Sequence, residues 1–161
     1  MNTGNEMNVV YKNLNIRFRK KTKKIVFTNG CFDVLHMGHI HILRESARLG
    51  SYLIVGLNSD ASIKRIKGQS RPINSQKDRA EILRCLKFVD EVIIFDEDTP
   101  ETLIKNVKPH ILTKGGDYEE KNIIGAAFVQ STGGEVKIIP LLPGKSSTSI
   151  IQKLIMNPHG S

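Results

Sequence analysis

Short apolar runs alternate with helical patterns along most of the chain. Five runs after residue 24 are rich in apolar and β-branched side chains: 25–28, 52–57, 92–95, 110–113 and 136–139. Between the first two runs, Ile40, Leu43 and Ala47 fall on one face of a helix. Continuous apolar strands separated by helices are typical of a parallel sheet that is covered on both sides. The pattern therefore predicts an α/β fold, with a parallel five-stranded sheet and helices on both faces.

Capping signals mark where two of the helices should begin. Ser75 precedes an apolar periodic segment, with Asp78 three residues later, which resembles a capping box with aspartate in place of Glu or Gln. Thr99 is predicted to be an N-cap, followed by Pro100 at the first helical position and Glu101 in the first turn. Four sets of apolar residues predict the inner faces of later helices: Ala80, Leu83 and Leu86; Leu103, Ile104 and Val107; Ile123, Ala127 and Phe128; and Ile150, Ile151, Leu154 and Ile155.

The segments that follow the predicted strands are polar or rich in glycine. They are expected to be loops at 28–39, 58–74, 114–118 and 140–149. Ligands of parallel sheets bind beyond the carboxyl ends of the strands. A ligand site is therefore predicted at the rim where these four loops meet.

Composition limits the class of protein. The chain of 161 residues is long enough for one domain with a real core. No apolar run approaches the roughly 18 to 20 residues that a membrane span requires, and the N-terminal residues lack a signal-peptide pattern. Two cysteines, Cys31 and Cys85, make no disulfide framework. We therefore expect a cytoplasmic protein with no membrane partner.

Most of the net charge of +8 lies near the N-terminus. Residues 1–24 hold seven basic side chains and one acidic side chain, so the remaining residues carry only +2. We interpret 1–23 as a basic arm, 24–156 as the folded domain and 157–161 as a tail. The arm is interpreted as a solvated lead-in or a segment that steers anions. Its aromatic residues are only Tyr11 and Phe18, so no nucleic-acid partner is expected.

The segment 28–39 carries the candidate chemistry. A short strand enters a glycine turn, and His36 and His39 then flank Gly38 at the start of an amphipathic helix. Free backbone N–H groups and the positive helix end make such a turn an anion site. Two imidazoles there could donate hydrogen bonds to a phosphate that gains negative charge during reaction. The segment is therefore predicted to bind a nucleoside triphosphate.

Two other interpretations of these histidines remain open. A zinc site could use His36, His39, His41 and Cys31, although His41 lies two helical positions from His39 and points to a different face. The histidines could instead be satisfied structural groups. Phosphate binding is favoured because Gly30 and Gly38 have no role in either alternative.

The segment 29–39, Asn-Gly-Cys-Phe-Asp-Val-Leu-His-Met-Gly-His, resembles the signature of the cytidylyltransferase-like nucleotidyltransferases. Val34 follows Asp33 as in the cytidylyltransferase branch, where the adenylyltransferases that make coenzyme A and NAD usually have proline. Further segments closely resemble the adenylyltransferase domain of the ADP-heptose synthases, across roughly residues 24–155: 58–60, 67–68, 71–74, 78–79, 89–90, 96–100, 114–118, 133–136 and 147–148. The resemblance implies a Rossmann-like fold.

The resemblance also implies an activity. The expected reaction transfers the adenylyl group of ATP to D-glycero-β-D-manno-heptose 1-phosphate and releases pyrophosphate, for lipopolysaccharide or other surface heptose synthesis. Mg²⁺ should bridge the triphosphate, with no metal held by the protein alone. A glycerol-3-phosphate cytidylyltransferase, another sugar or polyol phosphate nucleotidyltransferase, and a silent nucleotide-binding module are the alternatives. No kinase precedes the motif, so we expect a stand-alone homodimer with a separate heptose-phosphate kinase and phosphatase.

The resemblance assigns roles to individual residues. Expected catalytic residues are His36, His39, Arg79 and Lys67. Expected nucleotide-binding residues are Thr28, Asn29, Gly30, Cys31, Phe32, Gly38, Lys64, Arg71, Gly116, Asp117, Ser147 and Thr148.

Several of these residues have a structural alternative. Lys64 and Lys67 could belong to a solvated helix face, and Arg79 could simply pair with a carboxylate. Ser147 with Thr148 is also an N-cap signal. Cys31 is expected to pack near the site without reacting, because the reaction needs no thiolate.

Overall fold

The computed structural model describes residues 23–116, 118–142, 150, 151 and 156. The tail and nearly all of the arm predicted from the sequence lie outside these residues, and so do Asp117, Ser147 and Thr148. The division into arm, domain and tail therefore stays a prediction.

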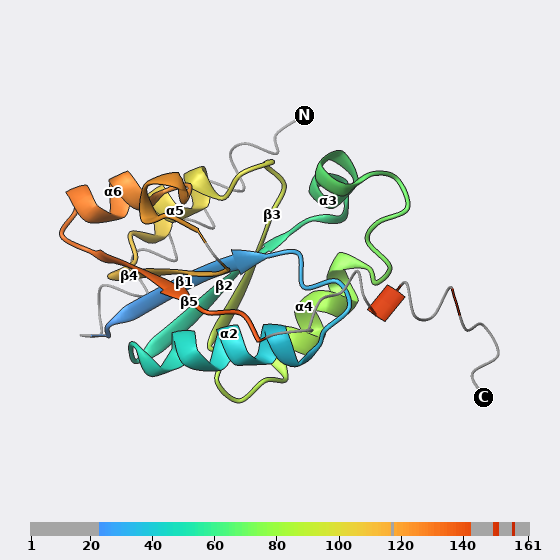
Figure 1. Ribbon diagram of the computed structural model, residues 1–161, viewed down its shortest axis with the longest axis horizontal. Helices are drawn as coiled ribbons and strands as arrows, with labels where there is room; N and C mark the ends of the chain where they lie inside the picture. Colours follow the sequence, from blue (N-terminus) through green and yellow to red (C-terminus); the bar gives the residue numbers. More distant parts are fainter. Residues whose placement is uncertain (1–22, 117, 143–149, 152–155, 157–161) are drawn as a thin grey trace.

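Five parallel strands form one sheet at the centre of the molecule (Figure 1). The strands are β1 (Ile25–Gly30), β2 (Tyr52–Asn58), β3 (Glu91–Phe95), β4 (Ile111–Gly115) and β5 (Glu135–Ile139). Their order is β3-β2-β1-β4-β5, and every neighbouring pair is parallel. The predicted five-stranded parallel sheet is confirmed. The strand order reverses beside β1, and such a reversal is where ligands of open α/β sheets bind.

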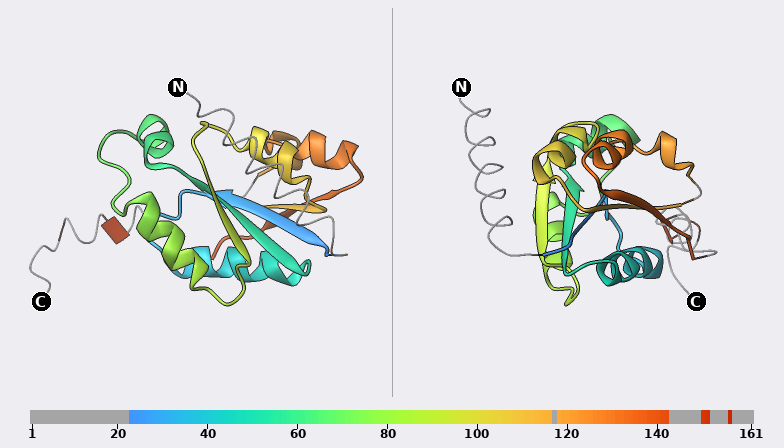
Figure 2. Two further views of the ribbon diagram at one scale, coloured as in Figure 1. Left: turned by 180° about the vertical axis from the view of Figure 1, so that it is seen from behind. Right: turned by 90° about the vertical axis from the view of Figure 1, so that its left-hand side faces the viewer.

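Helices cover both faces of the sheet, as predicted (Figures 1 and 2). Helices α2 (Met37–Arg48) and α4 (Gln76–Arg84) lie on one face, and α5 (Glu101–Val107) and α6 (Ala126–Ser131) on the other. Helix α3 (Asp60–Lys67) follows β2, and the 3₁₀ turn η1 (Glu120–Asn122) precedes α6. None of the helices in the described ranges combines the length and apolar character of a membrane span.

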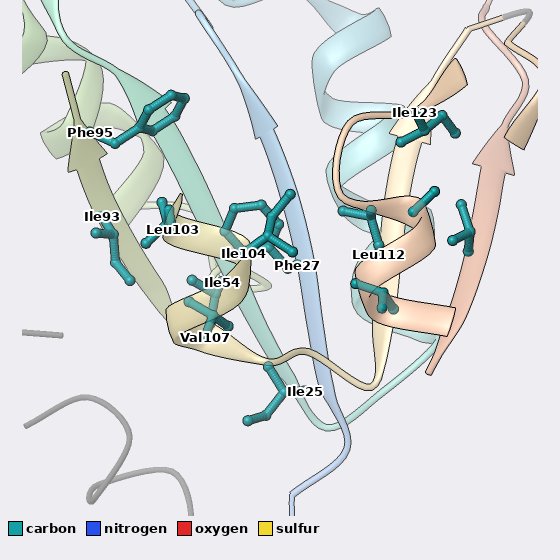
Figure 3. Close-up of a cluster of buried hydrophobic side chains, with 13 residues drawn as sticks. Ile25, Phe27, Ile54, Ile93, Phe95, Leu103, Ile104, Val107, Leu112 and Ile123 are labelled. Carbon is teal, nitrogen blue, oxygen red and sulfur yellow. The ribbon is translucent and has the colours of Figure 1, made fainter. Parts of the chain in front are cut away.

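Alternating side chains of the strands build a separate core on each face. Val26 of β1 faces the core that contains Leu43 of α2, whereas Phe27 faces the core that contains Ile104 of α5 (Figure 3). All four side chains are fully buried. Burying one large apolar side chain contributes roughly 1.5–3 kcal/mol, so both layers hold β1 in the middle of the molecule.

Three sequence predictions about local elements were wrong in detail. The predicted loop 58–74 contains α3, because Ser59 caps it by accepting the Ser62 N–H and Ile63 is fully buried. Helix α5 begins one residue later than predicted, so that Pro100 and not Thr99 occupies the cap position.

The helix predicted around Ile123, Ala127 and Phe128 begins only at Ala126, after Gly125 in a left-handed conformation, and buries Ala126 and Val129. Most of the last predicted helix lies outside the described residues.

A buried hydroxyl pair fixes α2, which has His36 as its N-cap and His39 in its first turn, to the sheet. Ser46 Oγ of α2 and Thr113 Oγ1 of β4 are 2.8 Å apart and share a hydrogen bond. Thr28 Oγ1 donates to the Thr113 carbonyl at 3.2 Å, which ties β1 to the same point. The three side chains are at most 1% exposed. The position of α2 relative to β1 and β4 therefore depends on these polar contacts as well as on apolar packing.

Replacing Thr113 by Val should lower the free energy of unfolding by about 1–3 kcal/mol, because the Ser46 hydroxyl loses its partner inside the protein. The double variant Ser46→Ala/Thr113→Val should lose less than Thr113→Val alone, since both polar groups are then gone. Chemical denaturation of the two variants measures the difference, with Thr102→Val on the exposed side of α5 as the control. Equal losses in the single and double variants would contradict the assigned pair.

Candidate active site at the end of the central strand

A cavity of about 150 Å³ lies where β1 ends. It is lined by residues 28–32, by His39 and Ile42 of α2, and by Lys114 and Gly115 of β4. The structure thus brings together six residues that the sequence singled out, 28–32 and His39. Pockets for whole ligands of drug size have roughly 300–1,000 Å³, so this cavity can hold only part of a nucleotide.

The two histidines lie against each other at the start of α2. His36 is the N-cap, and its Nδ1 accepts the backbone N–H of Gly38 at 3.0 Å. A neutral His36 therefore carries its proton on Nε2. The imidazole of His36 stacks on that of His39 with ring centroids 3.9 Å apart, and the Phe32 ring contacts His39 from a tilted position at 5.2 Å.

The imidazole of His39 is held neutral by its surroundings. Burial, together with the charges of His36 and Lys67, lowers its pKa from 6.5 to about 4 against the opposing effect of Asp33. Its Nδ1 is buried and has no hydrogen-bond partner among the described residues. A buried polar atom without a partner is costly, so this nitrogen is a candidate contact for a ligand.

Lys114 is a site residue to which the sequence analysis assigned no role. It lies near the end of β4, and its Nζ donates to Asn29 Oδ1 at 3.4 Å. Burial lowers the pKa of Lys114, the nearby Lys67 lowers it as well, and the Cys31 thiol acts in the opposite direction. The available signal was a single lysine in a strand whose preceding residues are all buried.

A buried carboxylate organises the turn after β1. Asp33 is 3% exposed and accepts the backbone N–H groups of Ile73 and Asn74 at 2.8 and 2.9 Å. Burial alone would raise the pKa of Asp33, but these bonds and the Arg71 guanidinium outweigh it and hold the pKa below its usual range. Arg71 donates to Asp33 at 2.7 Å. Arg71 thus forms an ion pair with Asp33, and its expected contact with a nucleotide stays a prediction.

Arg79 is held inside the protein by several acceptors, and its expected catalytic role stays a prediction. Its side chain is completely buried and does not line the cavity. The guanidinium donates to four acceptors, the carbonyls of Cys31, Asn58 and Asn74 and the carboxylate of Asp60, at 2.6–3.0 Å. The pairing with a carboxylate, which the sequence left open, is what the structure shows. A direct phosphate contact would require the guanidinium to give up acceptors in a buried position.

The other expected residues that the structure describes do not line the cavity. Lys64 and Lys67 are exposed on α3, which agrees with the helix-face alternative, although the charge of Lys67 reaches both His39 and Lys114. Gly38 is buried in the first turn of α2. Gly116 has φ +135, and a Cβ there would lie 2.6 Å from the Tyr118 ring, so glycine lets that ring pack against the end of β4.

Replacing Arg79 by Lys should lower the free energy of unfolding by about 3–5 kcal/mol without nucleotide present, because one ammonium cannot satisfy four separated acceptors. Arg84→Lys on the same helix is the matched control, since Arg84 is half exposed. Chemical denaturation measures both variants. An unchanged stability combined with a raised KM for nucleotide would show instead that Arg79 binds phosphate.

Comparison with known proteins places this site in a family. The cytidylyltransferase-like family model matches residues 27–153. The bifunctional protein HldE of Syntrophotalea carbinolica is 51% identical over 85% of this chain and 28% of its own length, and that of Campylobacter fetus subsp. fetus is 50% identical over 94% and 32%. This chain therefore spans about a third or less of these relatives.

A solved structure shows the same fold. The lipopolysaccharide core biosynthesis protein from Thermoplasma volcanium GSS1 superposes with a TM-score of 0.61 at 34% identity, covering 74% of this chain and 97% of that one. The residues matched by the family model include the glycine turn, both histidines and all residues that line the β1–α2 cavity. The chain belongs to the cytidylyltransferase-like family of nucleotidyltransferases.

Proposed function

We propose that this chain transfers the adenylyl group of ATP to D-glycero-β-D-manno-heptose 1-phosphate, giving ADP-heptose and pyrophosphate. The observation that carries the proposal is the stacked pair of His36 and His39 beside the cavity at the end of β1. The sequence similarity to the bifunctional HldE proteins and the structural similarity to a lipopolysaccharide core biosynthesis protein support the choice of substrate.

The reaction is an in-line displacement at phosphorus. An oxygen of the acceptor phosphate forms a bond to the α-phosphorus of ATP, and the bond from that phosphorus to the bridging oxygen breaks as pyrophosphate leaves. The protein's task in such a transfer is to position the groups and stabilise charge.

The residues at the start of α2 suit that task. The proton on Nε2 of a neutral His36, the neutral imidazole of His39 and the free N–H groups of the first helical turn supply hydrogen bonds to phosphate oxygens. Lys114 adds a positive charge on the β4 side. No covalent intermediate on the protein is needed.

The residues at the site fit a Mg²⁺ ion that arrives with the triphosphate. Asp33 lies in the turn after β1, but its oxygens already accept from two backbone N–H groups and Arg71. Within the described ranges, no three His, Cys, Asp or Glu side chains are grouped to hold a metal. Phosphate and water oxygens are ligands that Mg²⁺ prefers, and the ion would neutralise part of the triphosphate charge.

The partners of the reaction extend the proposal. In it, a heptose-phosphate kinase and a phosphatase supply the heptose 1-phosphate, and the enzyme works in the cytoplasm as a homodimer.

A panel of nucleotides and acceptors tests the substrates. Pyrophosphate release should be measured with ATP, CTP and GTP, each combined with heptose 1-phosphate or glycerol 3-phosphate. We expect ATP with heptose 1-phosphate to exceed every other pair by at least about ten-fold in kcat/KM, which corresponds to about 1.4 kcal/mol in transition-state free energy. Preference for CTP with glycerol 3-phosphate would show that the substrate assignment is wrong.

Two variants in the same panel test the site. His39→Ala should lower kcat by roughly 10²–10³-fold, because a preorganised donor at the reacting phosphate is lost. His41→Ala removes the same residue type from the same helix but outside the cavity lining, so it should keep the wild-type rate. Full turnover by His39→Ala would refute the assigned role.

A further inference from the structure

A second cavity, of about 190 Å³, lies next to the first at the carboxyl ends of β1 and β4. It is lined by Asn29, Lys114, Pro100, Tyr118 and residues 122–124. Water in the liquid occupies about 30 Å³ per molecule, so the space corresponds to about six waters. The volume is therefore suitable for a group the size of a small sugar.

The two cavities open on opposite faces of the sheet and share two residues. The first cavity is lined by Phe32 from the core that α2 and α4 cover. The second is lined by Ile123, which belongs to the core beneath α5 and α6 (Figure 3). Asn29 and Lys114 line both. The hydrogen-bonded pair of Lys114 and Asn29 therefore stands at the boundary between the two spaces.

The geometry of in-line displacement gives the two spaces different roles. The attacking oxygen approaches phosphorus from the side opposite the leaving group. If the triphosphate lies along the glycine turn and His39 in the first cavity, the attacker must come from elsewhere. The second cavity joins the first at Lys114. Its positive charge suits the place where the acceptor phosphate meets the α-phosphate of ATP.

We propose that the second cavity holds the sugar of the phosphorylated acceptor and that Lys114 Nζ binds its phosphate beside the α-phosphate. The inference rests on the proposed function and names the acceptor subsite of that reaction. In this arrangement Lys114 is a catalytic residue that contacts both substrates.

The chemistry of the second cavity suits a carbohydrate. The Tyr118 ring, packed over Gly116, and the side chains of Ile123 and Ile124 offer apolar surface to the C–H groups of a sugar ring. The amides of Asn29 and Asn122 can donate to and accept from its hydroxyls. Burial lowers the pKa of Lys114, and a bound phosphate would favour its charged form.

Filling the second cavity from its exposed side tests the proposal. Ile124 is 46% exposed, so Ile124→Trp should fold normally while its indole occupies the space. We expect the KM for the sugar 1-phosphate to rise at least about ten-fold, with the KM for ATP unchanged within about two-fold. Ile82→Trp on α4, where Ile82 is 42% exposed, is the matched control and should change neither constant.

Lys114→Met is the second variant and keeps the length of the side chain without its charge. It should lower kcat/KM roughly 10²–10³-fold, with Lys114→Arg recovering part of the loss and the melting temperatures of both variants close to that of the wild type.

The outcomes separate this inference from the proposed function. A raised KM for ATP alone in Ile124→Trp would show that the second cavity takes the nucleotide, and no change in either KM would also overturn the inference. Wild-type turnover by Lys114→Met would remove the assigned contact. Absence of turnover with every sugar phosphate already in the wild-type enzyme would overturn the proposed function itself, and the acceptor subsite with it.

Discussion

The architecture of the site depends on one buried cation. The Arg79 side chain is completely buried, and its guanidinium joins the turn after β1, the end of β2, the first residue of α3 and the loop before α4 by donating to Cys31, Asn58, Asp60 and Asn74. A buried charge is tolerated only where hydrogen bonds and an opposite charge compensate it. These segments must therefore stay together, and the buried Asp33 joins two of them a second time.

The segments joined by Arg79 and Asp33 hold His36 and His39 in a fixed arrangement at the start of α2. His36 Nδ1 accepts the Gly38 N–H as the helix cap, and this bond orients the His36 ring. The ring of His39 is held between the rings of His36 and Phe32. Burial and neighbouring charges keep His39 neutral. The start of α2 thus presents hydrogen-bond donors that suit anionic oxygens. Lys114 of β4 adds positive charge to the same cavity.

The sequence predicted the fold well because each strand contains a short run rich in apolar side chains, and helical patterns separate these runs. That residues 28–32 and His39 lie together at the end of β1 was predictable, since one continuous segment carries them all. The ion pairs of Arg71 and Arg79 were not predictable from residue type. A guanidinium suits a phosphate and a carboxylate equally well, and only the tertiary structure places Asp33 and Asp60 beside these side chains. Lys114 is 85 residues from its partner Asn29, so no local pattern reveals the contact.

A triphosphate bound against the stacked imidazoles must change the proton affinity of His39, which a titration of this residue measures. NMR of the imidazole C–H resonances, assigned with His39→Ala, should give a pKa of about 4 for His39 in the free protein. Saturating ATP should raise this pKa toward or above the ordinary 6.5, because phosphate oxygens stabilise the charged imidazolium. A pKa that stays near 4 while ATP is bound would contradict the account.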